Sequence, residues 1–211
     1  GNVDLLYKEN VENERFRLSY VFDIGTNHDN RLKLATDYLK FLGTYELSPA
    51  EVQQEFYKLG CEVSFQCGIE QTKLTISGLQ SNFESSLKLF EDILANARAD
   101  EEALLNLKLA TIKERNDAKL NKQTILWSAM MNYAKYGENS AFRNKMSQED
   151  LNNVTSSELL DLIKNLSSYN HRITYYGPEN MNKVSISLNK YHTNNTNLKE
   201  IPDGVIYEEL P

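Results

Sequence analysis

Two hydrophobic periods alternate along this 211-residue chain, and their order limits the folds that it can adopt. Residues 14–24, ERFRLSYVFDI, place apolar side chains at every second position, which predicts a half-buried strand. Residues 61–67 and 71–78 also alternate and predict a pair of strands. Elsewhere apolar residues recur every three to four positions, as in helices. The predicted helices cover residues 31–42, 49–59, 81–97, about 100–120, about 122–136 and a segment that begins at Thr155.

Polar motifs mark several helix starts. The predicted capping boxes pair a hydroxyl residue with a glutamate three positions later: Ser48 with Glu51, Ser81 with Glu84 and Thr155 with Glu158. Pro49 then occupies a favoured first helical position. Gly60 is the predicted end of the helix at residues 49–59. Asp100 is the predicted start of the long helix.

Two further strands are expected near the end of the chain, at residues 171–176 and 183–189, with Gly177-Pro178 as the turn between them. Adjacent strands joined by short turns indicate antiparallel pairs. We therefore predict an α+β fold of two layers, in which a largely antiparallel sheet packs against helices on one face. Residues 1–191 are expected to form a single domain, followed by a polar linker over 192–211 toward a following domain.

Composition excludes some classes of function. The formal net charge of −7 argues against sequence-independent binding to nucleic acid, which needs a basic surface. The acidic balance favours basic peptides as ligands. No apolar run approaches the ~18 residues that a membrane-spanning helix needs.

The histidines and cysteines do not form a recognisable site. His28, His171 and His192 lack the spacing that places two metal ligands on one helix face, so we expect surface or capping roles. Cys61 and Cys67 lie in one extended region and would be ~20 Å apart along a strand, too far for a disulfide. Both are expected to be free and to be buried side chains of strand residues.

Two helical clusters have alternative interpretations. Aromatic and methionine side chains could form an interaction surface, although helical core packing is the preferred interpretation: Trp127, Met130, Met131 and Tyr133. Basic residues on the long helix, interspersed with acidic ones, are expected to form a solvated face: Lys108, Lys113, Arg115, Lys119 and Lys122.

The helical run Asn30–Thr44, NRLKLATDYLKFLGT, resembles the zinc helix of the insulinase (pitrilysin) family of metallopeptidases. In that family an inverted H-x-x-E-H motif lies on a helix, and the chain often continues as x-L-F-x-G-T. Counting back from the Gly-Thr pair, the two histidine positions fall on Leu34 and Tyr38, and the glutamate position falls on Asp37. The family's third zinc ligand, a glutamate about 76 residues after the second histidine, aligns with Glu114. Glu114 could be a relic of that site, although a solvated helix residue is the preferred interpretation.

Other segments follow the family pattern in order, from about Leu5 to about Asn189. The matching segments are the opening strand with its F-x-x-G-T loop, Leu59–Ser64, Ile76–Leu79 with the helix after it, Tyr136-Gly137 through Val154-Thr155, and Tyr176–Pro178. The departures decide the function that this resemblance implies. Leu34 cannot bind zinc, neutral Tyr38 is a poor donor, and Asp37 would have no metal-bound water to deprotonate.

The resemblance therefore implies a non-catalytic domain from the inactive C-terminal half of an insulinase-like peptidase, with no metal, cofactor or catalytic residue of its own. Zinc and peptide hydrolysis would belong to a separate catalytic half. This chain would form part of the wall of a clamshell chamber around a peptide substrate. Its partners would be homologous domains of the same polypeptide or a catalytic subunit, with a bacterial periplasm or cell envelope as the expected location.

The alternative is a structural or assembly protein with the same fold, like the core subunits of respiratory complexes, that takes no part in proteolysis. An H-x-x-E-H motif in the same polypeptide or in a neighbouring gene would favour the peptidase interpretation.

Overall fold

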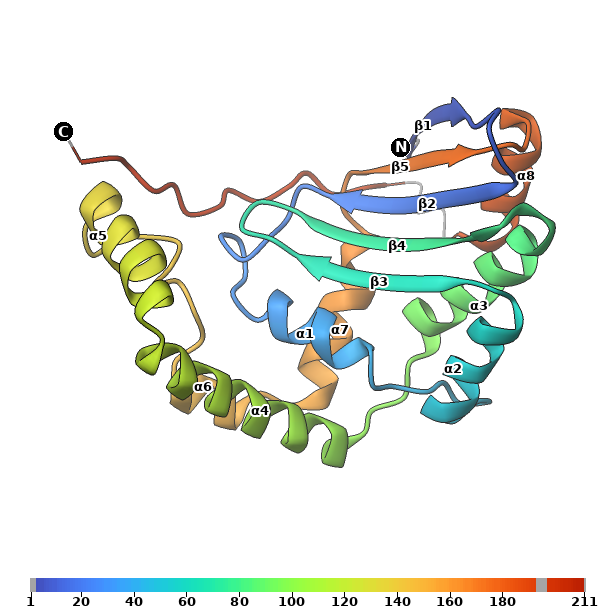
Figure 1. Ribbon diagram of the computed structural model, residues 1–211. Coiled ribbons are helices and arrows are strands. Elements are labelled where there is room, and N and C mark those ends of the chain that lie inside the picture. The colour runs from blue at the N-terminus through green and yellow to red at the C-terminus, as the bar shows by residue number, and fades with distance from the viewer. Residues whose placement is uncertain (1–2, 193–196, 211) are drawn as a thin grey trace.

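A computed structural model describes residues 3–192 and 197–210, and its centre is a five-stranded sheet (Figure 1). The strands are β1 (Asp4–Glu9), β2 (Arg15–Phe22), β3 (Glu62–Cys67), β4 (Thr72–Leu79) and β5 (His171–Gly177). They are arranged in the order β1-β5-β2-β4-β3, and each neighbouring pair is antiparallel except β1 with β5. The predicted α+β class with a largely antiparallel sheet is confirmed.

Helices form the second layer of the molecule. They are α1 (Leu32–Leu39), α2 (Pro49–Lys58), α3 (Phe83–Asn96), α4 (Glu101–Leu120), α5 (Met131–Tyr136), α6 (Gln148–Asn153), α7 (Ser156–Leu166) and α8 (Met181–Tyr191). A 3-10 turn, η1 (Gln80–Asn82), precedes α3, and a π-helix, η2 (Thr124–Met130), joins α4 to α5. In Figure 1, α1, α3 and α7 lie beneath one face of the sheet.

The core lies between this face and the helices. Strand β2 turns Phe16, Leu18, Tyr20 and Phe22 into it, as the alternation in the sequence predicted, and all four are almost fully buried. Each fully buried side chain of this size stabilises the fold by about 1.5–3 kcal/mol. The other face of the sheet carries mostly polar side chains and has no helix over it in Figure 1.

Most predicted helix starts are confirmed. Ser48 with Glu51 and Thr155 with Glu158 form capping boxes, and the Asp100 side chain accepts a hydrogen bond from the third backbone N–H of α4. The predicted box of Ser81 is wrong. An N-cap needs extended backbone, whereas Ser81 lies inside the 3-10 turn η1, so α3 begins two residues later.

The strand predicted at residues 183–189 is also wrong, because this segment belongs to helix α8. Its alternating residues, KVSISLN, fit both periods. In the helix Val184 and Leu188, four positions apart, are buried, whereas Ile186 is 67% exposed. The Asn180 side chain caps the first turn by accepting a hydrogen bond from the Asn182 N–H. Strand β1, which the sequence pattern did not indicate, pairs in parallel with β5.

Helix α4, η2 and α5 form an arm that extends away from the sheet (Figure 1). The aromatic and methionine cluster lies on this arm, and the preferred prediction of core packing is wrong. Its exposed fractions are 62% for Trp127, 56% for Met130, 53% for Met131 and 59% for Tyr133. The cluster therefore presents a large apolar surface that the described residues of this chain leave mostly uncovered.

The C-terminal segment 197–210 runs from the sheet to helix α5 of the arm (Figure 1). The backbone N–H of Val205 donates to the Asn27 carbonyl (2.8 Å), and the N–H of Leu210 donates to the Lys135 carbonyl (2.7 Å). An ion pair of 2.7 Å joins Lys135 to Glu209. The segment that we predicted to be an exposed linker thus makes hydrogen bonds to both the body and the arm.

Candidate functional site

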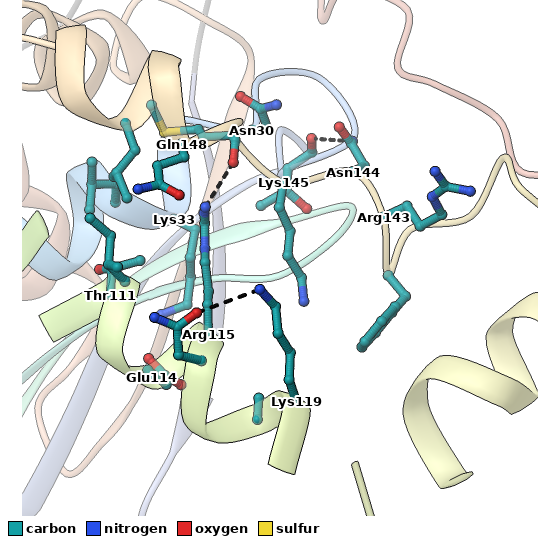
Figure 2. Close-up of a pocket in the computed structure, with 18 of the residues that line it drawn as sticks. Asn30, Lys33, Thr111, Glu114, Arg115, Lys119, Arg143, Asn144, Lys145 and Gln148 are labelled. Atoms are coloured by element: carbon teal, nitrogen blue, oxygen red, sulfur yellow. Dashed lines mark hydrogen bonds between the residues drawn. The ribbon is translucent and has the colours of Figure 1, made fainter. Parts of the chain in front are cut away.

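Three of the four residues at metal-motif positions line one groove, between helix α1 and the arm. Figure 2 shows this groove, with Glu114 labelled among its lining residues. Leu34 and Asp37 come from α1, and Glu114 comes from α4. The groove has a volume of about 780 Å³. The fold therefore brings these positions together, as the resemblance implied, although the chain has changed their chemistry.

The α1 side of the groove lacks the histidine ligands that the family's zinc helix carries. Leu34 is 6% exposed and offers only hydrocarbon. Asp37 forms ion pairs with Lys33 (2.5 Å) and Lys40 (2.6 Å). Burial disfavours ionisation of Asp37, but the hydrogen bonds from the two lysines outweigh it and hold the pKa of the carboxyl below its ordinary value. Asp37 is thus an anion whose charge is already neutralised.

Tyr38 points into the core and does not line the groove. Its hydroxyl accepts a hydrogen bond from the Asp100 N–H (2.8 Å) and donates one to the Asp100 carbonyl (2.8 Å). The hydroxyl of Ser156 lies 3.0 Å away. Tyr38 therefore ties α1 to the starts of α4 and α7, which is a structural role.

Glu114 lies on the opposite wall and is exposed. Within residues 3–192 and 197–210, no three histidine, cysteine, aspartate or glutamate side chains are grouped so that they could hold a metal ion. A zinc site needs about four ligands in tetrahedral geometry. The residues present in the groove do not fit that requirement.

The three histidines have different environments. The ring nitrogen Nδ1 of His28 accepts a hydrogen bond from the Gly25 N–H (3.1 Å), which agrees with a capping role in a loop. His171 and His192 are 7% and 6% exposed, so a surface role is wrong for both, although His192 is the C-cap residue of α8. Their Nε2 atoms face one another at the junction of β5 and the end of α8.

This histidine pair extends into a buried polar chain. Nδ1 of His192 lies 2.8 Å from a carboxylate oxygen of Glu91, and the Tyr20 hydroxyl donates a hydrogen bond to the same oxygen. Burial and the nearby Glu91 charge raise the pKa of Tyr20 well above its ordinary value. No local spacing in the sequence indicated this cluster, because its members come from β2, α3, β5 and the end of α8.

Both cysteines are free, as the sequence predicted. The prediction of buried strand residues is wrong in part, because Cys67 is only partly buried and Cys61 lies one residue before β3. Cys61 is buried, with its sulfur 2.8 Å from the hydroxyl oxygen of Ser86. Burial raises the pKa of both thiols, Cys61 and Cys67, so neither is activated as a thiolate nucleophile.

The basic face of α4 is only partly a solvated surface. Lys108 donates hydrogen bonds to the carbonyls of Asn152 (2.9 Å) and Val154 (2.7 Å). Arg115 donates one to the carbonyl of Met146 (2.9 Å). These contacts attach α4 to the segment that contains α6.

Comparison with known proteins supports the family resemblance that the sequence motifs indicated. The sequence model of the family described as insulinase (peptidase family M16) matches residues 10–155. Comparison with curated protein sequences found no match.

Solved structures share the fold over nearly the whole chain. A peptidase M16 inactive domain from Pseudomonas fluorescens matches with a TM-score of 0.78 and 16% identity, over 96% of this chain and 52% of that one. The periplasmic protease PqqL from Escherichia coli matches with a TM-score of 0.74 and 15% identity, over 96% of this chain and 23% of that one.

A third structure, the ferredoxin protease FusC in complex with Arabidopsis ferredoxin, matches with a TM-score of 0.77 and 12% identity. That match covers 98% of this chain and 23% of the other. The chain therefore spans about half or less of the length of these structures.

Proposed function

This chain belongs to the insulinase family of peptidases (peptidase family M16), and from that premise we propose that it is a non-catalytic domain of a peptide-degrading chamber. In this proposal it forms part of the chamber wall, and zinc-dependent hydrolysis takes place in a separate catalytic half. The observation that carries the proposal is the groove at the metal-motif positions, where Leu34 and an ion-paired Asp37 stand in place of metal chemistry.

The arm supplies the contact with other domains. Its exposed apolar side chains, Trp127, Met130 and Met131, would leave water when a homologous domain or a catalytic subunit packs against them. The greater length of the similar structures supports such a neighbour, because this chain covers only 52%, 23% and 23% of them and the remainder leaves room for further domains. We accordingly treat residues 1–191 as one domain and 192–211 as the connection to the next.

The enclosed substrate is proposed to be a peptide, and the location a bacterial periplasm or cell envelope. The likeness to a periplasmic protease and to a protease that holds a ferredoxin supports both proposals through the shared fold. No helix in the described part of the chain is long and apolar enough to cross a membrane.

The test is reconstitution with the half that carries H-x-x-E-H, encoded in the same reading frame or beside it. We expect that half to cleave a fluorogenic peptide efficiently only when this chain is present, and this chain alone to cleave nothing. Cleavage by this chain alone would overturn the proposal. An unaffected catalytic half that never associates with this chain would also overturn it, and would favour the assembly role.

A further inference from the structure

The groove between α1 and the arm is basic, although the chain as a whole carries a net charge of −7. Two carboxylates line it, Asp37 and Glu114. The cationic side chains that line it are Lys33, Arg115, Lys119, Arg143 and Lys145. The lining thus has a net charge of +3, and a local field of this sign attracts anions even to an acidic protein.

Several of these cations have no carboxylate partner. Lys33 neutralises Asp37. Within the described ranges neither Lys119 nor Lys145 forms an ion pair, since Lys119 contacts only the Asn116 side-chain oxygen at 3.5 Å. The Lys145 nitrogen lies 4.1 Å from the centre of the Phe142 ring.

Lys145 is held in an environment that disfavours its charge. Burial lowers its pKa, and the nearby positive charge of Arg115 lowers it further, against a smaller opposing effect of Glu114. The charge of an anion bound beside it would oppose both effects, because an opposite charge favours the protonated ammonium.

The cations converge from two walls of the groove. Figure 2 shows Lys119 on α4 and Lys145 on the segment after the arm, with their side chains directed toward one another. The guanidinium of Arg115 donates a hydrogen bond to the Met146 carbonyl (2.9 Å), and its other N–H donors have no hydrogen-bond partner among the described residues. This geometry suits a carboxylate that approaches from the opening.

Nine apolar and seven uncharged polar residues make up the rest of the lining. The larger apolar side chains are those of Leu34, Ile112, Ile125, Phe142, Met146 and Leu151. A volume of about 780 Å³ accommodates several residues of an extended chain but is large for a single small anion. The combination of apolar lining and unpaired cations matches a peptide in which acidic and apolar residues alternate.

We propose that this groove binds an extended polypeptide segment rich in acidic and apolar residues, with carboxylates held by Arg115, Lys119 and Lys145. This deepens the proposed chamber function by naming the substrate class that the inactive domain captures. It also departs from the expectation, drawn from net charge alone, that basic peptides are preferred.

The test is fluorescence anisotropy of the whole chain with two labelled peptides of equal length. One alternates glutamate and leucine, and the other alternates lysine and leucine. We expect saturable binding of the glutamate peptide, at least about tenfold tighter than that of the lysine peptide, and weaker at high salt. Equal binding of both peptides, or no saturable binding of the glutamate peptide, would overturn the proposal.

Matched variants locate the site. The double substitution Lys119→Glu and Lys145→Glu reverses two groove charges. Lys113→Glu with Lys88→Glu makes the same change in net charge at two exposed lysines outside the groove, one of them on the same helix α4. We expect at least about a tenfold loss of affinity in the groove variant and little change in the control.

An equal loss in both variants would mean that only net charge matters, and would contradict the proposal. Lys119→Gln with Lys145→Gln serves as a milder groove variant if the charge reversals unfold the chain, as circular dichroism would reveal. The binding assay needs no catalytic half. Failed reconstitution would therefore refute the chamber role and leave the proposed peptide binding intact, and failed peptide binding would refute the groove proposal and leave the chamber role intact.

Discussion

The Nε2 atoms of His171 and His192 lie 3.1 Å apart in the core, and this contact fixes where protons are held. Nδ1 of His171 lies 2.8 Å from the Tyr169 carbonyl, which only accepts, so Nδ1 carries a hydrogen. Nε2 of a neutral His171 then accepts from Nε2 of His192, and Nδ1 of His192 lies 2.8 Å from a carboxylate oxygen of Glu91.

This arrangement predicts a specific dependence of stability on pH. Burial, aided by the charge of His192, lowers the pKa of His171 below its ordinary value near 6.5. The folded state therefore binds fewer protons than the unfolded state between these two pKa values. The contribution of His171 is fully retained above about pH 6.5 and is lost as the pH falls toward the folded pKa.

Urea unfolding of the wild type and of His171→Asn tests this pH dependence. The measurements cover about pH 5 to 8, the range in which histidine side chains change charge. We expect the variant to lose part of the decline in free energy of unfolding on the acid side. Identical slopes for the wild type and His171→Asn would refute the assignment.

Tyr38→Phe should destabilise the chain without affecting the groove. The change removes the acceptor of the Asp100 N–H and a hydroxyl beside Ser156, so we expect a loss of about 1–3 kcal/mol in the free energy of unfolding. Tyr45 is 75% exposed, and Tyr45→Phe is the matched control. If Tyr38→Phe lowers the free energy of unfolding no more than Tyr45→Phe does, the hydroxyl of Tyr38 does not join α1 to α4 and α7.

Gly25→Ala should be destabilising because of a close backbone approach. A methyl group at this position would lie 2.3 Å from the carbonyl oxygen of Ile69, and relieving the clash requires movement of the β3–β4 turn. We expect a cost of about 1–3 kcal/mol in thermal or urea unfolding. At Gly68 the nearest atom would be 3.4 Å away, so a Gly68→Ala variant of similar cost would contradict this explanation.

The apolar surface of the arm should matter for assembly and not for folding. Trp127 is 62% exposed, so Trp127→Glu should change the free energy of unfolding of this chain by less than about 0.5 kcal/mol. It should markedly weaken co-elution with the catalytic half in size-exclusion chromatography. Tyr57→Glu, at a residue 85% exposed on α2, should leave co-elution intact. Equal weakening by both would argue against docking through the arm.

Local signals in the sequence predicted much of the fold. Alternation located β2, and the pairs Ser48 with Glu51 and Thr155 with Glu158 located two helix starts, because these interactions involve residues close in sequence. The prediction failed at residues 183–189, where Val184 and Leu188 fit both a strand and a helix. Packing against the body of the domain decided between them.

The candidate site was predictable only in part. Position counting aligned Leu34, Asp37 and Glu114 with the motif positions, and the structure shows that these three residues line one groove. It gave no sign that Tyr38 faces the core, nor that His171 meets His192, since neither contact repeats at a local period. The exposure of Trp127 was likewise invisible, because an apolar helical stripe fits a core and an interface equally well.

The most direct test of the central claim, that this domain has lost the zinc chemistry of its family, is the zinc content of the purified, tag-free chain by elemental mass spectrometry. Leu34 and the ion-paired Asp37 predict no stoichiometric zinc. About one zinc per chain, retained after dialysis against a weak chelator, would contradict the account and would require a metal site that includes residues outside the groove.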